Sequence, residues 1–186
     1  SEPSFGFVAA AGMMAALGSE GAASIESVFG NDPAGALIDA TVPANKPVSV
    51  CQLTTQKFAD KVALTMLKEF ASCVKRVAAD RNDPIASLSR LESCIDEISM
   101  DSRQKVARAV GKLAFQIAKR CLATGVDLGQ IGGTCAVGAD ASVVASCLEA
   151  KMACNVCEMA SGAFALGTDC DAFDDGVSNA SCGGTP

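Results

Sequence analysis

The sequence predicts an all-α fold, a disulfide-crosslinked helical bundle of about four to five helices. An extended N-terminal arm precedes the bundle and an irregular acidic C-terminal tail follows it. Apolar residues recur at three- and four-residue steps through most of residues 51–164, which is the spacing of helix faces. Ten cysteines, an even number, are spread over the last three quarters of the 186 residues, as in proteins crosslinked in an oxidising compartment.

We expect three regions in the chain: an Ala/Gly/Pro-rich N-terminal arm over residues 1–50, a helical disulfide-bonded domain over 51–166, and an acidic cysteine-containing tail over 167–186. The arm has a small-residue stretch near 7–17 that could form a helix, and a short helical turn is expected near 24–29. After it, prolines should break any regular structure; these are Pro33, Pro43 and Pro47.

The bundle is predicted to begin with a long helix whose apolar stripe includes Phe58, Val62, Met66, Phe70 and Val77. Asp83 and Pro84 are suited to cap and begin the next helix. The stripe of that helix consists of Leu88, Leu91, Ile95 and Ile98.

A fourth helix should be capped by Asp101 and Ser102 and stopped by Gly125. Its inward residues are Val106, Val110, Leu113 and Ile117. A glycine-rich loop then leads to a fifth helix near 140–164.

Helix geometry restricts the disulfide pairing. Cys51 and Cys73 share a face but lie roughly 33 Å apart at 1.5 Å per residue, so they cannot pair with each other. Cys73 and Cys94 are nearly symmetric about the turn at 82–84, so an antiparallel hairpin should bring them together in a disulfide. A disulfide between Cys170 and Cys182 would tie the tail. The remaining cysteines are also expected to be crosslinked; they are Cys51, Cys121, Cys135, Cys147, Cys154 and Cys157.

The stretch CLEAKMACNVCEMA at 147–160 admits three interpretations. Thiolate and thioether ligands suit Cu(I), and Met-x-Cys-x-x-Cys resembles the motif of copper metallochaperone domains; the ligands would be Met152, Cys154, Cys157 and Met159. A thioredoxin-like redox pair would need a helix N-terminus, whereas Cys154 falls mid-helix. We favour the third interpretation, in which Cys147, Cys154 and Cys157 are each crosslinked to a different neighbour.

The tail carries clustered carboxylates before a glycine, a composition typical of calcium loops. The candidate ligands are Asp169, Asp171, Asp174 and Asp175. An EF-hand loop starting at Asp169 would put Phe173 at a ligand position, so we favour a solvated acidic turn and expect no metal or other cofactor. Asn179-Ala-Ser181 is an N-glycosylation sequon.

Charge is segregated along the chain. Residues 51–125 hold 13 of the 15 Lys and Arg but 8 of the 21 Asp and Glu, and the whole chain carries a formal charge of −6. This pattern indicates either solvated helix faces or complementary surfaces that dock on each other. Nucleic acid is not an expected partner, because the net charge is negative and no Tyr or Trp can stack on bases.

The composition argues against an enzyme. The chain has no histidine, which excludes Ser-His-Asp and Cys-His catalysis. No glycine-rich phosphate loop, nucleophile elbow or paired-carboxylate pattern is evident in the sequence.

The cysteine layout resembles that of exported, cysteine-rich helical proteins of environmental proteobacteria, a group without an assigned activity. Short pieces carry the resemblance: CQ at 51–52, CL at 121–122 and 147–148, and DCDAFDDG at 169–176. The resemblance implies export and crosslinking.

These observations favour a secreted structural protein that assembles into a filament or a surface-layer-like array. The arm of one subunit would lie along the helices of the next, a heterologous contact that does not close on itself. Its apolar contacts would come from Phe5, Phe7, Met13, Met14, Leu17 and Phe29. The alternative is a periplasmic or secreted module that binds Cu(I) or an apolar ligand.

The location follows from the same observations. The first residues lack a basic n-region, and Phe5 to Leu17 is too short to span a bilayer, so we expect the mature form of an extracellular or periplasmic protein and a homo-oligomer or polymer without a transmembrane segment.

Overall fold

The computed structural model describes residues 25–26, 28–30, 32–79, 88–131, 133–136, 140–164, 166–171, 173 and 182. Four long helices make up most of this part, and a short helix, α2 (Pro33–Ala36), precedes them. The long helices are α3 (Lys46–Ala78), α4 (Leu88–Met100), α5 (Lys105–Arg120) and α6 (Ala141–Phe164). The described residues contain no strand, so the predicted all-α, disulfide-rich fold is confirmed.

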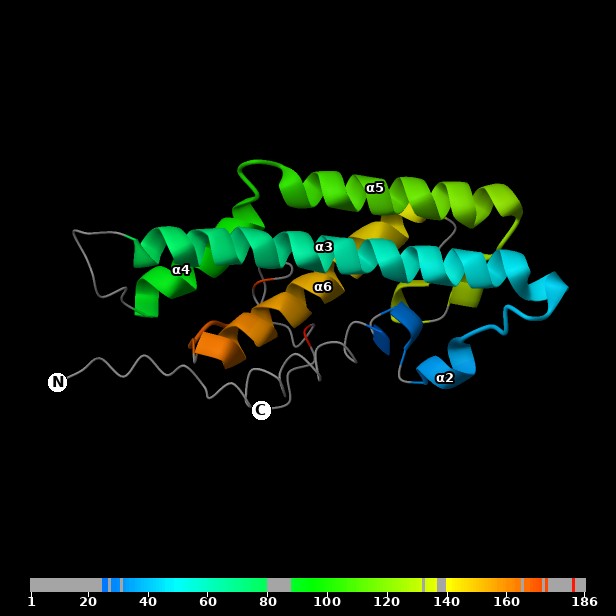
Figure 1. Cartoon of the computed structure of the whole chain (residues 1–186), viewed down its shortest axis with the longest axis horizontal. Coiled ribbons are helices and arrows are strands. Elements are labelled where there is room, and N and C mark those ends of the chain that lie inside the picture. The colour runs from blue at the N-terminus through cyan, green and yellow to red at the C-terminus, as the bar shows by residue number, and fades with distance from the viewer. Residues whose placement is uncertain are drawn as a thin grey trace.

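The long helix α3 organises the bundle (Figure 1). Its 33 residues extend over about 50 Å at 1.5 Å per residue. Helix α5 runs antiparallel along one side of α3, α4 packs against the C-terminal part of α3, and α6 crosses beneath both α3 and α5. The hydrophobic core lies where α3, α5 and α6 meet.

The predicted apolar stripes face this core. Val62, Met66 and Phe70 are buried on α3, and Leu113 and Ile117 are buried on α5. Helix α6 differs, because its buried residues are not confined to one stripe. A helix that is apolar on most sides belongs in the interior. Those buried residues include Val144, Ala145, Leu148, Met152, Ala153, Val156 and Ala160.

The described residues of the predicted arm, 25–26, 28–30 and 32–50, are anchored on the bundle. Val28 and Phe29 are buried in the core. Helix α3 also begins at Lys46, five residues earlier than the proposed domain boundary.

The prolines expected to break regular structure instead begin helices. Pro33 opens α2, Pro43 opens a 3-10 turn, and Pro47 lies in the first turn of α3. A first turn needs no backbone N–H from these positions, which is why proline is accepted there.

Gln52 connects the arm to the bundle. Its side chain is buried, and its amide nitrogen donates to the carbonyl of Ala36 at 2.8 Å and to that of Gln130 at 3.1 Å. Its carbonyl oxygen accepts the backbone N–H of Ile38 at 3.0 Å. One side chain therefore satisfies backbone groups from two segments that are far apart in sequence.

Asp101 caps α5, as the sequence predicted. Its carboxylate accepts the backbone N–H groups of Lys105 at 2.7 Å and Ala107 at 2.8 Å. The loop needs left-handed backbone at Asp101 (φ 34°) and Gln104 (φ 52°). The predicted stop, Gly125, lies further on: α5 ends at Arg120, and Gly125 (φ 77°) closes the following 3-10 turn.

All ten cysteines form disulfides. Cys73 pairs with Cys94, their Cα atoms 5.5 Å apart, as the hairpin geometry predicted. Cys51 pairs with Cys121, which joins the start of α3 to the end of α5.

The three cysteines of α6 bond to three different partners, as we expected. Cys147 pairs with Cys135, Cys154 with Cys182 and Cys157 with Cys170. The predicted bond between Cys170 and Cys182 is therefore wrong. Both tail cysteines lie against α6, where Cys154 and Cys157 are within reach, so the tail is bonded to the bundle instead of to itself.

Crosslinking of this extent places the chain among proteins of an oxidising compartment. Among the described helices, none combines the length and the apolar composition needed to cross a bilayer.

Replacement of Gln52 by Ala should lower the free energy of unfolding by about 2–4 kcal/mol, because buried backbone groups of two segments lose their partners. Urea denaturation followed by circular dichroism measures the change. Leu53→Ala is the matched control: this neighbour is 63% exposed, so its loss should cost less than about 0.5 kcal/mol. Equal effects of the two substitutions would contradict the role of Gln52.

Replacing both Cys73 and Cys94 by Ala should lower the free energy of unfolding by about 3 kcal/mol, as chain entropy predicts for a loop of this length. The sequence separation of the two cysteines is 21 residues. The same urea titration measures the loss. Unchanged stability would show that the disulfide does not constrain the unfolded chain.

Candidate binding groove between α3 and α5

A groove with positively charged walls lies between α3 and α5, with a volume of about 510 Å³. The apolar part of its lining consists of Phe58, Leu64 and Ala109. No acidic residue is among the described residues that line it. Five cationic side chains line the same groove, namely Lys61, Lys68, Lys105, Arg108 and Lys112. An anionic group with an apolar part fits this combination.

The cations come from spaced positions on two antiparallel helices, two turns apart on α3 and one turn apart on α5. On α3, Lys61 and Lys68 are seven residues apart and therefore share a face with Leu64. On α5, Lys105, Arg108 and Lys112 follow at steps of three and four. Helix α5 holds five basic residues and no acidic one, so it supplies no local counter-charge.

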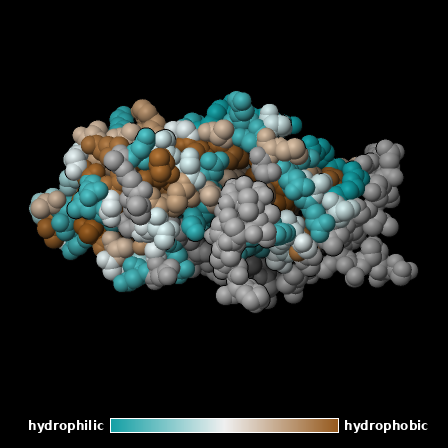
Figure 2. Space-filling view, turned by 180° about the vertical axis from the view of Figure 1, so that it is seen from behind, coloured by the Kyte–Doolittle hydropathy of each residue, from teal (hydrophilic) through white to brown (hydrophobic). Residues whose placement is uncertain are grey.

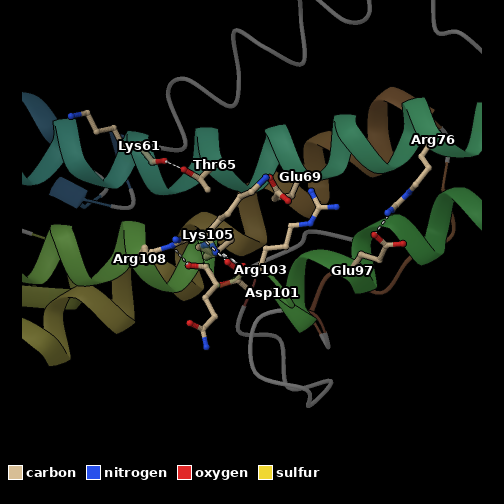
Figure 3. Close-up of polar contacts among 11 residues, drawn as sticks. Lys61, Thr65, Glu69, Arg76, Glu97, Asp101, Arg103, Lys105 and Arg108 are labelled. Atoms are coloured by element: carbon tan, nitrogen blue, oxygen red, sulfur yellow. Dashed lines mark hydrogen bonds and ion pairs between the residues drawn. The ribbon is translucent and has the colours of Figure 1, made fainter.

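Lys105 and Arg108 form an ion pair and hydrogen bonds within the protein (Figure 3). Lys105 forms an ion pair with Glu69 on α3, which holds the two helices together at this end of the groove. The guanidinium of Arg108 donates to the backbone carbonyls of Gln104 and Arg103, at 2.9 and 2.8 Å. The exposed ammonium groups of Lys61, Lys68 and Lys112 are the ones best placed to meet a ligand.

Large apolar side chains are exposed on the same two helices. Leu64 is 52% exposed in the groove, and Phe115 of α5 is 59% exposed. Lysines lie over the aromatic rings: the ammonium nitrogen of Lys61 is 4.2 Å from the ring centre of Phe58, and that of Lys119 is 5.8 Å from that of Phe115. The surface is therefore both positively charged and partly apolar, as at a contact site.

A polar cleft of about 230 Å³ lies beyond the Lys105 end of the groove, between α3, α4 and the α4–α5 loop. Arg76 and Glu97 form an ion pair across it, and Arg103 and Asp101 also line it. Because its cations and carboxylates face one another, the cleft offers less net charge to a ligand than the groove does.

Glu149 of α6 lies with Asp101 in a smaller cavity of about 170 Å³. Burial raises the pKa of Glu149, and the negative charge of Asp101 raises it further. The carboxylate of Asp101 is held in place by its hydrogen bonds to the first turn of α5. The fold therefore keeps the carboxylates of Asp101 and Glu149 near each other.

The candidate copper ligands do not form a thiolate site. The sulfurs of Cys154 and Cys157 are bonded to Cys182 and Cys170. Met152 is fully buried in the core, whereas Met159 is half-buried. The Met-x-Cys-x-x-Cys motif at 152–157 therefore belongs to a helix that carries two crosslinks.

The candidate calcium ligands are only partly described. The carboxylate of Asp169 accepts the backbone N–H of Asp171 at 3.1 Å, and that of Asp171 accepts the backbone N–H of Cys182 at 3.2 Å. Asp174 and Asp175 lie outside the described residues. Within those residues, no three acidic or cysteine side chains gather as metal ligands would.

Of the six apolar arm residues expected to contact a neighbouring subunit, only one is described. Phe29 is 5% exposed and packs in the core of its own chain, so it is not available to a neighbour. The buried neighbour Val28 anchors the same turn. The other five lie outside the described residues; they are Phe5, Phe7, Met13, Met14 and Leu17.

Sequence reasoning missed the groove, although a signal was present. The signal is the excess of Lys and Arg over residues 51–125 together with the spacing of Lys61, Leu64 and Lys68, which places these three on one helix face. Only the antiparallel placement of α5 adds Lys105, Arg108 and Lys112 to that face (Figure 1).

The chain was compared with protein-family models, with curated proteins and with solved structures, and none of the three comparisons found a match.

Replacing Glu149 by Gln should stabilise the protein at pH 7 and have much less effect near pH 4. The raised pKa means that the fold disfavours the charged carboxylate, so the native glutamate loses stability as the pH rises through its folded pKa. Urea midpoints of both proteins at the two pH values measure the difference. Glu26→Gln, at an exposed glutamate, controls for the loss of one charge. An equal gain at both pH values would contradict the explanation.

Proposed function

We propose that this chain is a secreted, disulfide-stabilised structural protein that assembles with copies of itself into a filament or a surface layer. The N-terminal part of one subunit would contact the helices of the next. The site of action would be extracellular or periplasmic, which is the setting in which five disulfides persist.

The observation that supports this proposal best is the exposed face of α3 and α5. Leu53 and Leu64 of α3 are 63% and 52% exposed, and Phe115 of α5 is 59% exposed. The same helices also expose Lys61, Lys68 and Lys112. Isolated apolar residues on a surface are ordinary, but large apolar side chains amid charge of one sign are the features of a contact site for an oppositely charged surface.

The crosslinks are also consistent with a structural role. Each of the long helices is bonded either to another helix or to a flanking segment. A subunit crosslinked in this way keeps its surfaces in fixed relative positions, and an assembly repeated over many copies needs that rigidity.

A second candidate function is a binding module, which the groove itself favours. A groove lined by apolar side chains and five cations suits a small anionic amphiphile such as a fatty acid. Cu(I) is not supported as the ligand, because the sulfurs of Cys154 and Cys157 form disulfides.

The native protein should form particles larger than one 18.8 kDa chain, in proportions that rise with concentration. Raising the salt concentration from 0.05 to 1 M should reverse the assembly, because screening weakens contacts between charged surfaces. Multi-angle light scattering and electron microscopy measure the mass and the form of the particles. A mass of one chain at all concentrations and in low salt would exclude self-assembly and leave the binding module.

A further inference from the structure

The segment that precedes α3 has a surface opposite in charge to the groove. We call the described residues of this segment, 25–26, 28–30 and 32–42, the acidic segment. Three of its apolar side chains are exposed: Ile25 by 41%, Leu37 by 48% and Val42 by 43%. Three exposed carboxylates lie in the same stretch, those of Glu26, Asp32 and Asp39. It contains no basic residue. The acidic segment therefore exposes apolar side chains among negative charges.

The fold holds the acidic segment in place from beneath. The buried side chain of Gln52 bonds to the backbone of Ala36 and Ile38, and the Cys51–Cys121 disulfide lies next to Gln52. The carboxylate of Asp39 accepts from the backbone N–H and the hydroxyl of Thr41, which lowers the pKa of Asp39 and fixes the orientation of its side chain. A partner would thus meet a pre-formed surface, which limits the entropy lost on binding.

The groove offers the complementary set of groups. Lys61, Lys68 and Lys112 can face carboxylates, while Leu64 and Phe58 can take apolar side chains. Both surfaces combine apolar contacts with charges of one sign, and the signs are opposite. Complementary charge gives such a contact its specificity, and the apolar side chains add burial.

The two surfaces cannot meet within one chain. Figure 1 places α2 on one side of the beginning of α3 and α5 on the other side of α3, so α3 separates the acidic segment from the cations of α5. Seen from behind, the end of the molecule that carries α2 also has hydrophobic residues at its surface among hydrophilic ones (Figure 2). A contact between them must join two copies, head to tail.

The structure assigns the groove between α3 and α5 as the docking site for the acidic segment of a second copy of this chain. The contact is heterologous, because different surfaces of the two copies meet, and each added copy leaves one groove and one acidic segment free. Assembly therefore continues into a fibre unless the rotation between copies closes a ring. This inference rests on the proposed self-assembly and specifies which surfaces mediate it.

The test uses two triple variants and their mixture. The groove variant is Lys61→Glu, Lys68→Glu and Lys112→Glu, which leaves the structural partners Lys105 and Arg108 in place. The segment variant is Glu26→Lys, Leu37→Lys and Val42→Lys, which leaves the hydrogen-bonded Asp32 and Asp39 in place. Each variant alone should associate at least about tenfold more weakly than the native chain, because one of its two surfaces is reversed in charge.

Mixing the two variants should restore association. The groove variant retains a native acidic segment and the segment variant retains a native groove, so one native contact can form between them. Light scattering should then show particles of at least two chains in the mixture. Circular dichroism of each variant checks that the bundle is still folded.

The matched control is Lys57→Glu, Lys75→Glu and Arg120→Glu. These exposed basic residues lie on the same two helices but do not line the groove, and the variant has the same net charge as the groove variant. It should assemble like the native chain. If the groove variant also does so, the groove is not the docking site, although self-assembly stands.

Two further outcomes would overturn the inference in other ways. A native chain that remains monomeric excludes both this contact and the proposed function. If that monomer instead binds vesicles containing phosphatidylglycerol, and the groove variant does not, the groove serves an anionic lipid surface and not a second copy.

Discussion

Helix α6 is the element on which the rest of the structure depends, because it is both central in the core and bonded by three disulfides to the segments on either side of it. Leu148 and Met152 are buried where α6 meets α3 and α5. Its cysteines bond to Cys135, Cys170 and Cys182, and each of these loops contributes roughly 3 kcal/mol in the chain-entropy model. The segments on both sides of α6 are therefore held against a helix that is itself buried.

This covalent restraint has a consequence for the surface. Five cationic side chains surround the groove, and like charges so close together repel one another. The Lys105–Glu69 ion pair offsets part of that repulsion, and the Cys51–Cys121 disulfide holds the other end of the α3–α5 contact. Repulsion between these cations would weaken the packing of two helices that are not crosslinked. Because α3 and α5 are joined at both ends, they can carry this charged face and leave it available for a partner.

Local patterns in the sequence predicted much of this fold. The apolar stripes located the four long helices, the position of Asp101 predicted its cap on α5, and the symmetry of Cys73 and Cys94 about a turn predicted their disulfide. The arm was less predictable. Its composition suggested an extended segment, but the buried amide of Gln52 binds its backbone, and neither Gln52 nor the burial of Phe29 can be recognised before the arm is placed on the bundle.

The sequence by itself determined which stretches are helical, which residues of each helix are apolar, and that the cysteines are crosslinked, since these depend on spacing within a segment and on composition. The tertiary structure alone decided four of the five disulfides and the groove. Ten cysteines allow about 945 complete pairings, and only the meeting of distant segments selects among them. Likewise, Lys61 and Lys112 belong to one charged surface only because α3 and α5 pack side by side, and that is a long-range consequence of burying their apolar faces against α6.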